Sequence, residues 1–315
     1  MRDAMFADIK ALHNIEIITT VDARIDSGNV ASIATVAVSI DATANAIEIW
    51  KVLISTCDAA LIVAPESDGV LCQLTQMVEA SGVENLGCAQ LAVDIASNKY
   101  DTFIALNSAG ISTIPTMIAD DFLSMSFNNV SLSSDGYVVK PIDGAGCEQT
   151  IFFKDEVSAH VWLRLAENKN QDFIVQPYQR GTAASMSLLC RDGQALLLSC
   201  NQQNIVITDT EHLIFQGAIV NGLSAHQANF KLLADHIASA IPTLNGFVGV
   251  DIILNGDQIF VVEINPRVTT TYIGLRDSLG LNPMRLLLDL VNANNSTFTL
   301  PSNIAHKAVE INLNA

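Results

Sequence analysis

Basic side chains are few in this chain of 315 residues. It has 16 Lys and Arg against 33 Asp and Glu, a net charge of −17 and a pI near 4.5. Such an acidic surface repels a phosphate backbone, which argues against a nucleic-acid-binding protein, although a nucleotide needs only a local cationic pocket. Charged residues make up 16% of the chain and hydrophobic ones 50%, so the composition also excludes a disordered protein. The length predicts about two domains.

Long hydrophobic runs and paired cysteines are also absent. The longest apolar run, from Ala59 to Pro65, is far shorter than the roughly 20 residues that span a bilayer. The first ten residues carry charges where a signal peptide has an apolar core. The six cysteines include no C-x-x-C pair, so they are interpreted as buried reduced thiols rather than as disulfides or zinc ligands. We therefore expect a cytoplasmic protein without a membrane partner.

The first hundred residues alternate apolar strands with helices. Continuous apolar runs at 15–21 and 60–64 are typical of strands that are covered on both faces, and helical spacing follows at 70–80 and 91–106. This alternation predicts a small open parallel sheet. Because the chain begins in a helical pattern, the first strand of this α/β domain is expected to be missing.

After Pro115 the pattern changes to mostly antiparallel strands mixed with helices, which indicates an α+β domain. Strands are expected at 137–140, 173–178, 185–190, 195–200 and 205–208, a hairpin at 247–265, and helices at 157–166, 223–239, 272–279 and 283–293. The predicted domains are 1–95 (α/β) and 96–315 (α+β), the latter with a central lid subdomain at about 115–180.

The hairpin carries three oxygen ligands of the kind that Mg²⁺ requires, namely Asp251, Glu263 and Asn265. Glu263 and Asn265 are two residues apart on one strand and therefore share a face. A three-residue loop at 255–257 would pair Asp251 with Val261 on that same face and align an apolar face behind the acids, whereas a two-residue loop at 255–256 would turn Asp251 away. We predict the odd-length loop and a metal site. The alternative is a half-solvated hairpin with ordinary exposed acids.

A lysine followed by a glycine-rich turn predicts a phosphate site. Lys140 ends an apolar strand, and Gly144 and Gly146 in the following segment 143–148 let backbone N–H groups approach phosphate oxygens. The segment matches neither the P-loop nor the dinucleotide fingerprint. Lys99 lies in the helical run upstream. Taken singly, these features are more often a surface turn and a solvated lysine.

Another strand ends in Gln176-Pro177-Tyr178, where free backbone groups beside apolar residues can hold the edge of an adenine; an ordinary strand end is the alternative. Taken in order, the four elements resemble the ATP-grasp superfamily. That family has a first lysine, a second lysine with a glycine-rich lid, an adenine hinge and a terminal Asp…Glu-x-Asn hairpin. The resemblance extends from about Lys99 to the C-terminus, and the upstream part resembles the domain that precedes the ATP-grasp domain.

The resemblance implies an ATP-grasp fold and an ATP-dependent ligase that phosphorylates a carboxylate and lets an amine displace the phosphate from the acyl phosphate. Implied cofactors are ATP and Mg²⁺, with Mn²⁺ as an alternative, and the implied partners are small-molecule substrates, an amino acid and an amine. The sequence is also compatible with a homodimer. The implied ATP ligands are Lys99, Lys140, Asp143, Gly144, Ala145, Gly146, Gln176, Pro177 and Tyr178; the implied metal ligands are Asp251, Glu263 and Asn265; and the implied catalytic residues are Lys140 and Arg267.

Three further segments, RDAM at 2–5, APESDG at 64–69 and INPRVTT at 264–270, resemble the tyramine–glutamate ligase group of archaeal methanofuran biosynthesis and its relatives in methylotrophic bacteria. This closer resemblance implies that the γ-carboxyl of glutamate is joined to tyramine or tyrosine. Arg276 and Tyr272 are the candidates for holding a substrate, since an arginine fork binds a carboxylate bidentately. Glu66 is the candidate for meeting an ammonium group.

The sequence departs from the family pattern at several positions. Gln176 and Ala183 stand where many ATP-grasp enzymes carry acids, and Gly249 stands where D-alanine ligases carry an arginine. We expect Arg267 to supply the missing charge. Two alternatives remain open: a ligase for another amino acid or peptide, and a nucleotide-binding protein without turnover.

Overall fold

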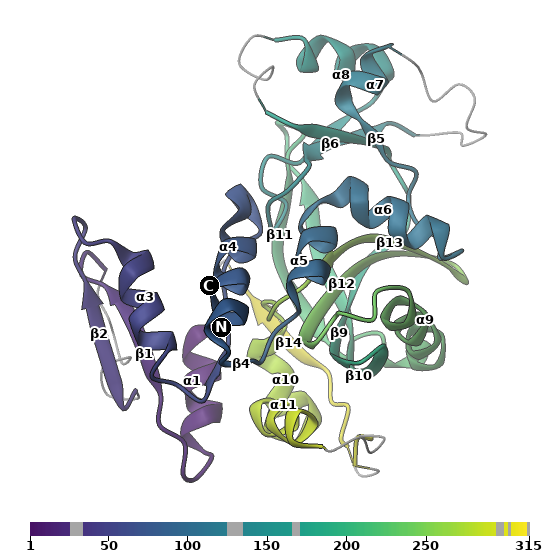
Figure 1. Cartoon of the computed structure of the whole chain (residues 1–315). Helices are drawn as coiled ribbons and strands as arrows, with labels where there is room; N and C mark the ends of the chain where they lie inside the picture. Colours follow the sequence, from purple (N-terminus) through teal and green to yellow (C-terminus); the bar gives the residue numbers. More distant parts are fainter. Residues whose placement is uncertain (26–33, 125–134, 166–170, 294–298, 302–303, 314–315) are drawn as a thin grey trace.

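A six-stranded sheet forms the centre of the structure, a computed structural model that describes residues 1–25, 34–124, 135–165, 171–293, 299–301 and 304–313 (Figure 1). Its order is β13-β12-β9-β10-β11-β14, and all neighbours are antiparallel. The strands are β9 (Thr182–Arg191), β10 (Gln194–Ile207), β11 (Leu213–Val220), β12 (Gly246–Asn255), β13 (Gln258–Asn265) and β14 (Val309–Asn312).

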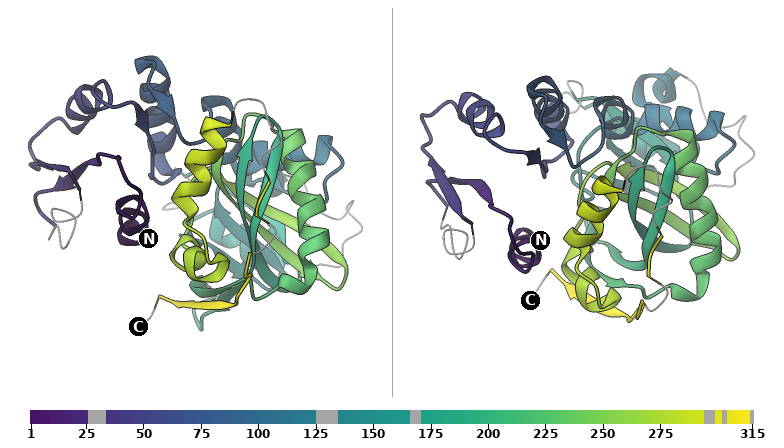
Figure 2. Two further views of the ribbon diagram at one scale, coloured as in Figure 1. Left: turned by 90° about the horizontal axis from the view of Figure 1, so that it is seen from below. Right: turned by 60° about the horizontal axis from the view of Figure 1, so that its bottom comes forward.

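Helices cover both faces of this sheet and create two hydrophobic cores. The helix α9 (Gln227–Ala240) packs on one face, while α10 (Tyr272–Leu279) and α11 (Pro283–Asn292) pack on the other (Figure 2). The expected strands at 195–200 and 205–208 are one strand, β10, because the polar residues between them continue the ladder with β9 and β11. The sequence did not predict β11 or β14.

A smaller four-stranded sheet forms the upper lobe in Figure 1, in the antiparallel order β5-β8-β6-β7. Its elements are β5 (Met117–Ile118), α7 (Ala119–Ser124), β6 (Tyr137–Pro141), β7 (Ile151–Phe153), α8 (Glu156–Leu163) and β8 (Phe173–Pro177). Phe122 and Val139 are fully buried in its separate core. This lobe lies within the expected lid subdomain, of which 125–134 and 166–170 are outside the described residues, as is the expected end of the 157–166 helix.

The N-terminal part contains two parallel strand pairs instead of the single parallel sheet expected. β1 pairs with β2 and β3 pairs with β4, and no ladder joins the two pairs among the described residues. The expected strand at 60–64 is reduced to a two-residue strand. The elements are α1 (Arg2–Lys10), β1 (Ile18–Asp22), β2 (Val36–Ile40), α3 (Ala46–Ile54), β3 (Ala59–Ala60), α4 (Val70–Ser81) and β4 (Glu84–Asn85). None of the described helices is long and apolar enough to cross a membrane.

The helix expected at 91–106 is broken into α5 (Gln90–Ser97) and α6 (Lys99–Ser108). The break occurs because Asn98 is extended (φ −106°, ψ 112°) and its side-chain oxygen accepts hydrogen bonds from the N–H groups of Tyr100 and Asp101. Such a cap satisfies donors at a helix start that have no partner within the helix. Lys99 is consequently the first residue of α6, and its side chain is turned inward and buried.

The β12–β13 hairpin corrects the predicted odd-length loop. Asn255 pairs with Gln258, so the loop has two residues, and continuing that register would place Asp251 opposite Val262. A register shift between Asp251 and Ile252 leaves Val262 as the extra residue, and Asp251 lies opposite Glu263. A β-bulge, and not an odd-length loop, therefore places Asp251 on the same face as Glu263. An apolar face lies behind the acids, formed by the buried side chains of Val250, Ile252, Val261 and Ile264. Val261, which the odd-length loop would have placed beside the acids, lies on this buried face instead.

Candidate functional site

A cavity of about 210 Å³ lies between the two sheets. β6 and β8 line it from the smaller sheet, and β9, β10, β11, β12 and β13 line it from the larger one. The glycine-rich segment 143–148 lines it as well. The residues expected from sequence that line this cavity are Lys99, Lys140, Asp143, Gly144, Ala145, Gly146, Gln176, Pro177, Tyr178, Asp251, Glu263, Asn265 and Arg267.

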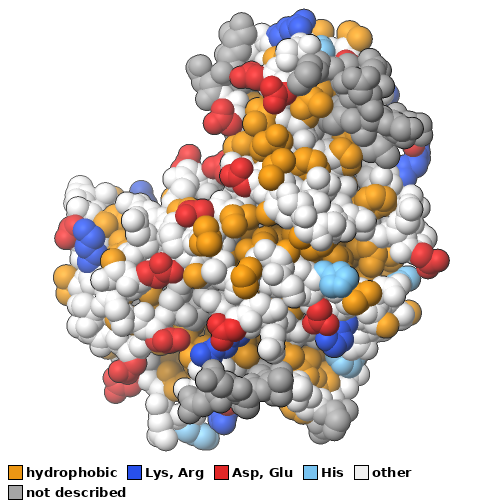
Figure 3. All heavy atoms as spheres, turned by 45° about the vertical axis from the view of Figure 1, so that its right-hand side comes forward, with side chains coloured by type: hydrophobic (Ala, Val, Ile, Leu, Met, Phe, Trp, Pro, Cys, Tyr) orange, Lys and Arg blue, Asp and Glu red, His pale blue; other side chains and the backbone are white. Residues whose placement is uncertain are grey.

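Cations gather in this cavity although the molecule is acidic. Acidic side chains are spread over the face shown in Figure 3, in keeping with the net charge of −17. Lys99, Lys140 and Arg267 nevertheless all line the cavity, and they are three of the 16 Lys and Arg in the chain. Buried or half-buried cations raise the local potential, which favours an anionic ligand at this place.

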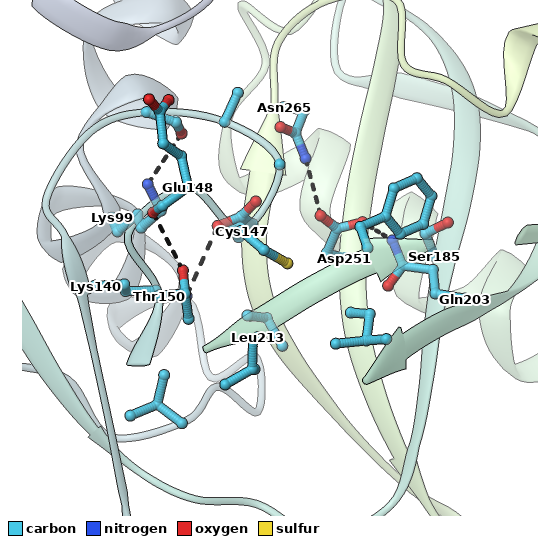
Figure 4. A pocket seen from close by; sticks show the side chains of 18 of the residues that line it. Lys99, Lys140, Cys147, Glu148, Thr150, Ser185, Gln203, Leu213, Asp251 and Asn265 are labelled. Atoms are coloured by element: carbon cyan, nitrogen blue, oxygen red, sulfur yellow. Dashed lines mark hydrogen bonds and ion pairs between the residues drawn. The ribbon is translucent and has the colours of Figure 1, made fainter. Parts of the chain in front are cut away.

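Lys99 ties helix α6 to the glycine-rich segment. Its ammonium donates to the carbonyl oxygens of Asp143 (2.7 Å) and Gly144 (3.1 Å), and its backbone N–H donates to the carbonyl of Ile142 (2.9 Å). Gly144 and Gly146 both have positive φ angles (91° and 69°), which glycine adopts without steric strain. The lysine therefore fixes the start of a segment whose backbone conformation suits close approach to a ligand (Figure 4).

Lys140 lies near the end of β6 and faces the β12–β13 hairpin. It is 5% exposed, and its Nζ is 3.7 Å from the carboxylate of Glu263. Burial lowers the pKa of Lys140, and Lys99 lowers it too, while the carboxylate of Glu263 opposes that shift. Within the part of the chain that the structure describes, the Lys140 ammonium makes this 3.7 Å contact and no hydrogen bond, so its donors are available to a further anion.

Two carboxylates face each other across the hairpin. Burial, together with repulsion from Glu263, raises the pKa of Asp251 to about 7. Burial acts in the same direction on Glu263, but Lys99, Lys140, a hydrogen bond with Asp251 and the charge of Arg267 together outweigh it, so the pKa of Glu263 is lowered. Asp251 accepts hydrogen bonds from Gln203 (2.8 Å) and from Asn265 (3.2 Å).

A divalent cation between two such carboxylates neutralises the repulsion between their charges. Together with the amide oxygen of Asn265, Asp251 and Glu263 form an oxygen donor set that fits Mg²⁺. Among the described residues there is no cluster of three or more His, Cys, Asp and Glu that could hold a metal ion alone. Mg²⁺ is commonly bound by one or two protein carboxylates together with substrate phosphates, and the Asp251–Glu263 pair fits that pattern.

The adenine-hinge candidates lie at the cavity wall. Gln176 is 4% exposed, and its side-chain amide donates to the hydroxyl of Thr116 (2.8 Å). The N–H of Tyr178 donates to the carbonyl of Gly136 (2.8 Å). That donor is not free, so recognition of an adenine edge here depends on other groups of the segment 176–178.

Arg267 follows the hairpin directly and is held on three sides. It donates from Nε and Nη2 to the two carboxylate oxygens of Glu66 (2.9 and 2.8 Å), and from Nη1 to the carbonyl of Val268 (3.2 Å). Its Nη2 also lies 3.4 Å from the side-chain oxygen of Asn265. Glu66 itself is 3% exposed and does not line the cavity, so the expectation that it meets a substrate ammonium does not fit this geometry.

Tyr272 and Arg276, the other substrate candidates, lie outside the cavity lining. The hydroxyl of Tyr272 and the guanidinium of Arg276 both donate to the buried carboxylate of Asp8, at 2.8 and 2.7 Å. These bonds attach α1 to α10 and satisfy a carboxylate that is 2% exposed. Periodicity cannot distinguish such packing from substrate binding, because Asp8 is 264 and 268 residues away from Tyr272 and Arg276 in sequence.

Two cavity residues, Gln203 and Cys147, were not singled out from sequence, and a third, Thr269, lies against Gly249. Gln203 lies within β10, after its buried stretch, and its side-chain amide donates to the carboxylate of Asp251. Thr269 packs so closely on Gly249 that a Cβ at 249 would lie 2.4 Å from its methyl group. Cys147 lines the cavity from the glycine-rich segment, and burial, together with the charges of Glu263 and Asp251, raises its pKa to about 12. The thiol of Cys147 therefore stays protonated, which does not suit a nucleophile.

Comparison with known proteins agrees with this arrangement. The ATP-grasp domain matches residues 96–271, and the pre ATP-grasp 3 domain matches residues 15–93. Tyramine–L-glutamate ligase of Methanocaldococcus jannaschii is 34% identical over 241 residues, which are 76% of this chain and 63% of that protein. The same enzyme of Methanocaldococcus fervens is 31% identical over 245 residues, 77% of this chain and 68% of that protein.

Solved structures show the same fold at low identity. The biotin carboxylase domain of 2-oxoglutarate carboxylase from Hydrogenobacter thermophilus, a dimer bound to MgADP, ADP and bicarbonate, superimposes with a TM-score of 0.74 at 13% identity, covering 94% of this chain and 68% of that chain. N5-carboxyaminoimidazole synthetase from Staphylococcus aureus, bound to ADP, also gives 0.74, at 14% identity and 94% and 76% coverage. Two facing sheets, a cavity between them and these matches lead to one conclusion: the chain belongs to the ATP-grasp family.

Proposed function

We propose that this protein is an ATP-dependent carboxylate–amine ligase that joins the γ-carboxyl of glutamate to tyramine or tyrosine. One observation carries the proposal: a single cavity is lined by three cations and by two opposed carboxylates. The cations are Lys99, Lys140 and Arg267, and the carboxylates are those of Asp251 and Glu263. A protein that only binds a nucleotide has no need of a paired carboxylate site as well as three cations.

In this proposal the two lysines hold the phosphates of ATP. Lys140 keeps donors free because its contact with Glu263 is 3.7 Å long, and Lys99 holds the glycine-rich segment over the cavity. That segment excludes water from the reacting groups, which protects an acyl phosphate from hydrolysis. Arg267 lies beside Asn265 and stabilises the charge that develops on the transferring phosphoryl group.

Asp251, Glu263 and Asn265 hold Mg²⁺, and the same oxygen ligands suit Mn²⁺. A divalent ion held by these three residues would supply charge neutralisation for the phosphates. Gln203 orients Asp251 by its 2.8 Å hydrogen bond, while Asn265 bonds the other oxygen of that carboxylate. The hydrogen bonds leave lone pairs on both carboxylate oxygens for a metal.

The substrate assignment rests on the two relatives named tyramine–L-glutamate ligase. The chain spans 63% of the length of the first of them, so its own activity and substrates are part of this proposal. Domain boundaries near residue 95, a cytoplasmic location and a homodimer belong to the same proposal.

The test is release of ADP from Mg-ATP with glutamate and either tyramine or tyrosine, with the product mass measured in parallel. The wild type is expected to release ADP only when both substrates are present and to form a glutamyl amide. Glu263→Gln removes a metal ligand and is expected to lower turnover by orders of magnitude. Glu84→Gln, the same change at an exposed acid of β4, is the control and keeps wild-type turnover. ATP binding without turnover for any amine would contradict the proposal.

A further inference from the structure

Glu66 begins a short turn that contacts two residues of the cavity lining, Asp143 and Arg267. A 3₁₀ turn at Ser67–Gly69 follows it and leads directly into α4. Asp68 has a positive φ of 55°, and the N–H of Leu71 donates to the carbonyl of Pro65 (3.2 Å). The backbone beside Glu66 is thus fixed by a proline, a left-handed residue and a helix start, which makes it a rigid support.

Both oxygens of the Glu66 carboxylate accept hydrogen bonds from Arg267, at 2.9 and 2.8 Å. The side chains are 3% and 13% exposed, so the pair is shielded from water. Bidentate arginine–carboxylate pairs fix the plane of the guanidinium as well as its position. No other carboxylate is within ion-pair distance of Arg267 among the residues that the structure describes.

The opposite side of the same turn contacts the glycine-rich segment. The N–H of Asp68 donates to the carboxylate of Asp143 (3.0 Å), and a Cβ at Gly144 would lie 3.6 Å from the hydroxyl of Ser67. One turn of the first domain therefore touches the segment that covers the cavity and the arginine that lines it. These contacts join elements about 75 and 201 residues apart in sequence.

We propose that Glu66 is a positioning residue that holds the Arg267 guanidinium toward the reacting groups from the N-terminal domain, and that it does not bind substrate. The inference deepens the proposed ligase function and rests on it where turnover is concerned. A long arginine side chain without this partner samples many rotamers, and small misplacements of a catalytic group reduce rate strongly. Loss of Glu66 therefore acts through Arg267 and on kcat rather than on the binding of ATP.

The experiment is a double-mutant cycle with the conservative variants Glu66→Gln and Arg267→Lys in the full chain. Glu66→Gln is expected to lower kcat at least 10-fold and to change the KM for ATP less than 3-fold. In the Arg267→Lys background the same change is expected to cost less than 2-fold, because the group that Glu66 positions is already altered. An equal loss in both backgrounds, or a loss expressed in the KM of glutamate or of the amine, would overturn the inference.

A second measurement does not depend on turnover and so separates this inference from the proposed activity. In protein labelled with ¹⁵N-arginine, the Nε–H signal that Arg267→Lys removes is expected to exchange slowly with solvent. Glu66→Gln should accelerate its exchange at least 10-fold, whereas Glu84→Gln should leave it unchanged. An Nε–H of Arg267 that is equally protected in Glu66→Gln would refute a positioning role. A wild type that shows the protected signal yet releases no ADP would refute the ligase proposal alone.

Discussion

Replacing Asp251 by asparagine is expected to stabilise the metal-free protein at alkaline pH. Burial and the charge of Glu263 raise the pKa of Asp251 from 3.8 to about 7. Between these values the folded state holds a proton that the unfolded state has lost, so the free energy of unfolding falls as the pH rises through this window. Above about pH 7 the buried charge opposes folding in full, and the neutral amide removes that opposition.

The size of the effect follows from the shift. A change of about 3 pH units corresponds to about 4 kcal/mol at about 1.4 kcal/mol per unit. Asparagine keeps one acceptor oxygen but turns an NH₂ group toward the other donor, so one of the hydrogen bonds from Gln203 and Asn265 is lost, at a cost of about 1 kcal/mol. We therefore expect Asp251→Asn to be more stable than the wild type by about 3 kcal/mol at pH 8, or about 6 °C in Tm at roughly 2 °C per kcal/mol.

The assay is thermal unfolding of both proteins at pH 4 and pH 8 in EDTA and again at pH 8 in excess Mg²⁺. At pH 4 the advantage of the variant should disappear, since the wild-type carboxyl is protonated. Excess Mg²⁺ should raise the Tm of the wild type and not that of the variant, because only the intact pair binds the ion. A Tm difference that is the same at both pH values would refute the view that Asp251 and Glu263 repel each other in the absence of a cation.

Three other substitutions give further tests. Lys99→Met removes the bonds to the glycine-rich segment and should weaken ATP binding at least 10-fold by calorimetry; unchanged affinity would contradict its role in holding that segment. Tyr272→Phe removes one hydrogen bond to Asp8 and should lower the free energy of unfolding by about 1–3 kcal/mol, measured as a lower Tm. The KM values for the substrates should stay unchanged, and a raised KM would indicate that Tyr272 binds a substrate. Gly249→Ala places a Cβ 2.4 Å from the methyl group of Thr269 and should reduce kcat. Thr269→Ser, which lacks that methyl group, should restore at least part of the loss, and no rescue would mean that the contact does not matter.

Local features of the site were readable from the sequence. The oxygen ligands of the hairpin, the lysine with its glycine-rich turn and the arginine after Asn265 all depend on residues close together in the chain, and the structure places them in one cavity. The face shared by Asp251 and Glu263 was also predicted correctly, but for the wrong reason. A bulge at Val262 sets that face, and a bulge has no sequence signal in a run of β-branched and aromatic residues.

Long-range partners could not be read from the sequence. Arg276 and Tyr272 carry side chains suited to a substrate carboxylate or ring, and only the position of Asp8 shows that they bind the first helix instead. Glu66 likewise had a plausible role at an ammonium group until Arg267 was seen to engage both of its oxygens. Such pairings are set by how the domains pack, and periodicity within a segment does not record them.

The most direct test of the account is the fate of oxygen in the γ-carboxyl of glutamate. Glutamate labelled with ¹⁸O in that group, incubated with the protein, Mg-ATP and tyramine or tyrosine, should transfer one ¹⁸O to inorganic phosphate for each glutamyl amide formed, with ADP as the other product. In the proposed reaction the γ-carboxyl oxygen attacks phosphorus and leaves with it when the amine displaces the phosphate. Amide formation with unlabelled phosphate, or with AMP in place of ADP, would contradict activation of the carboxylate by phosphoryl transfer.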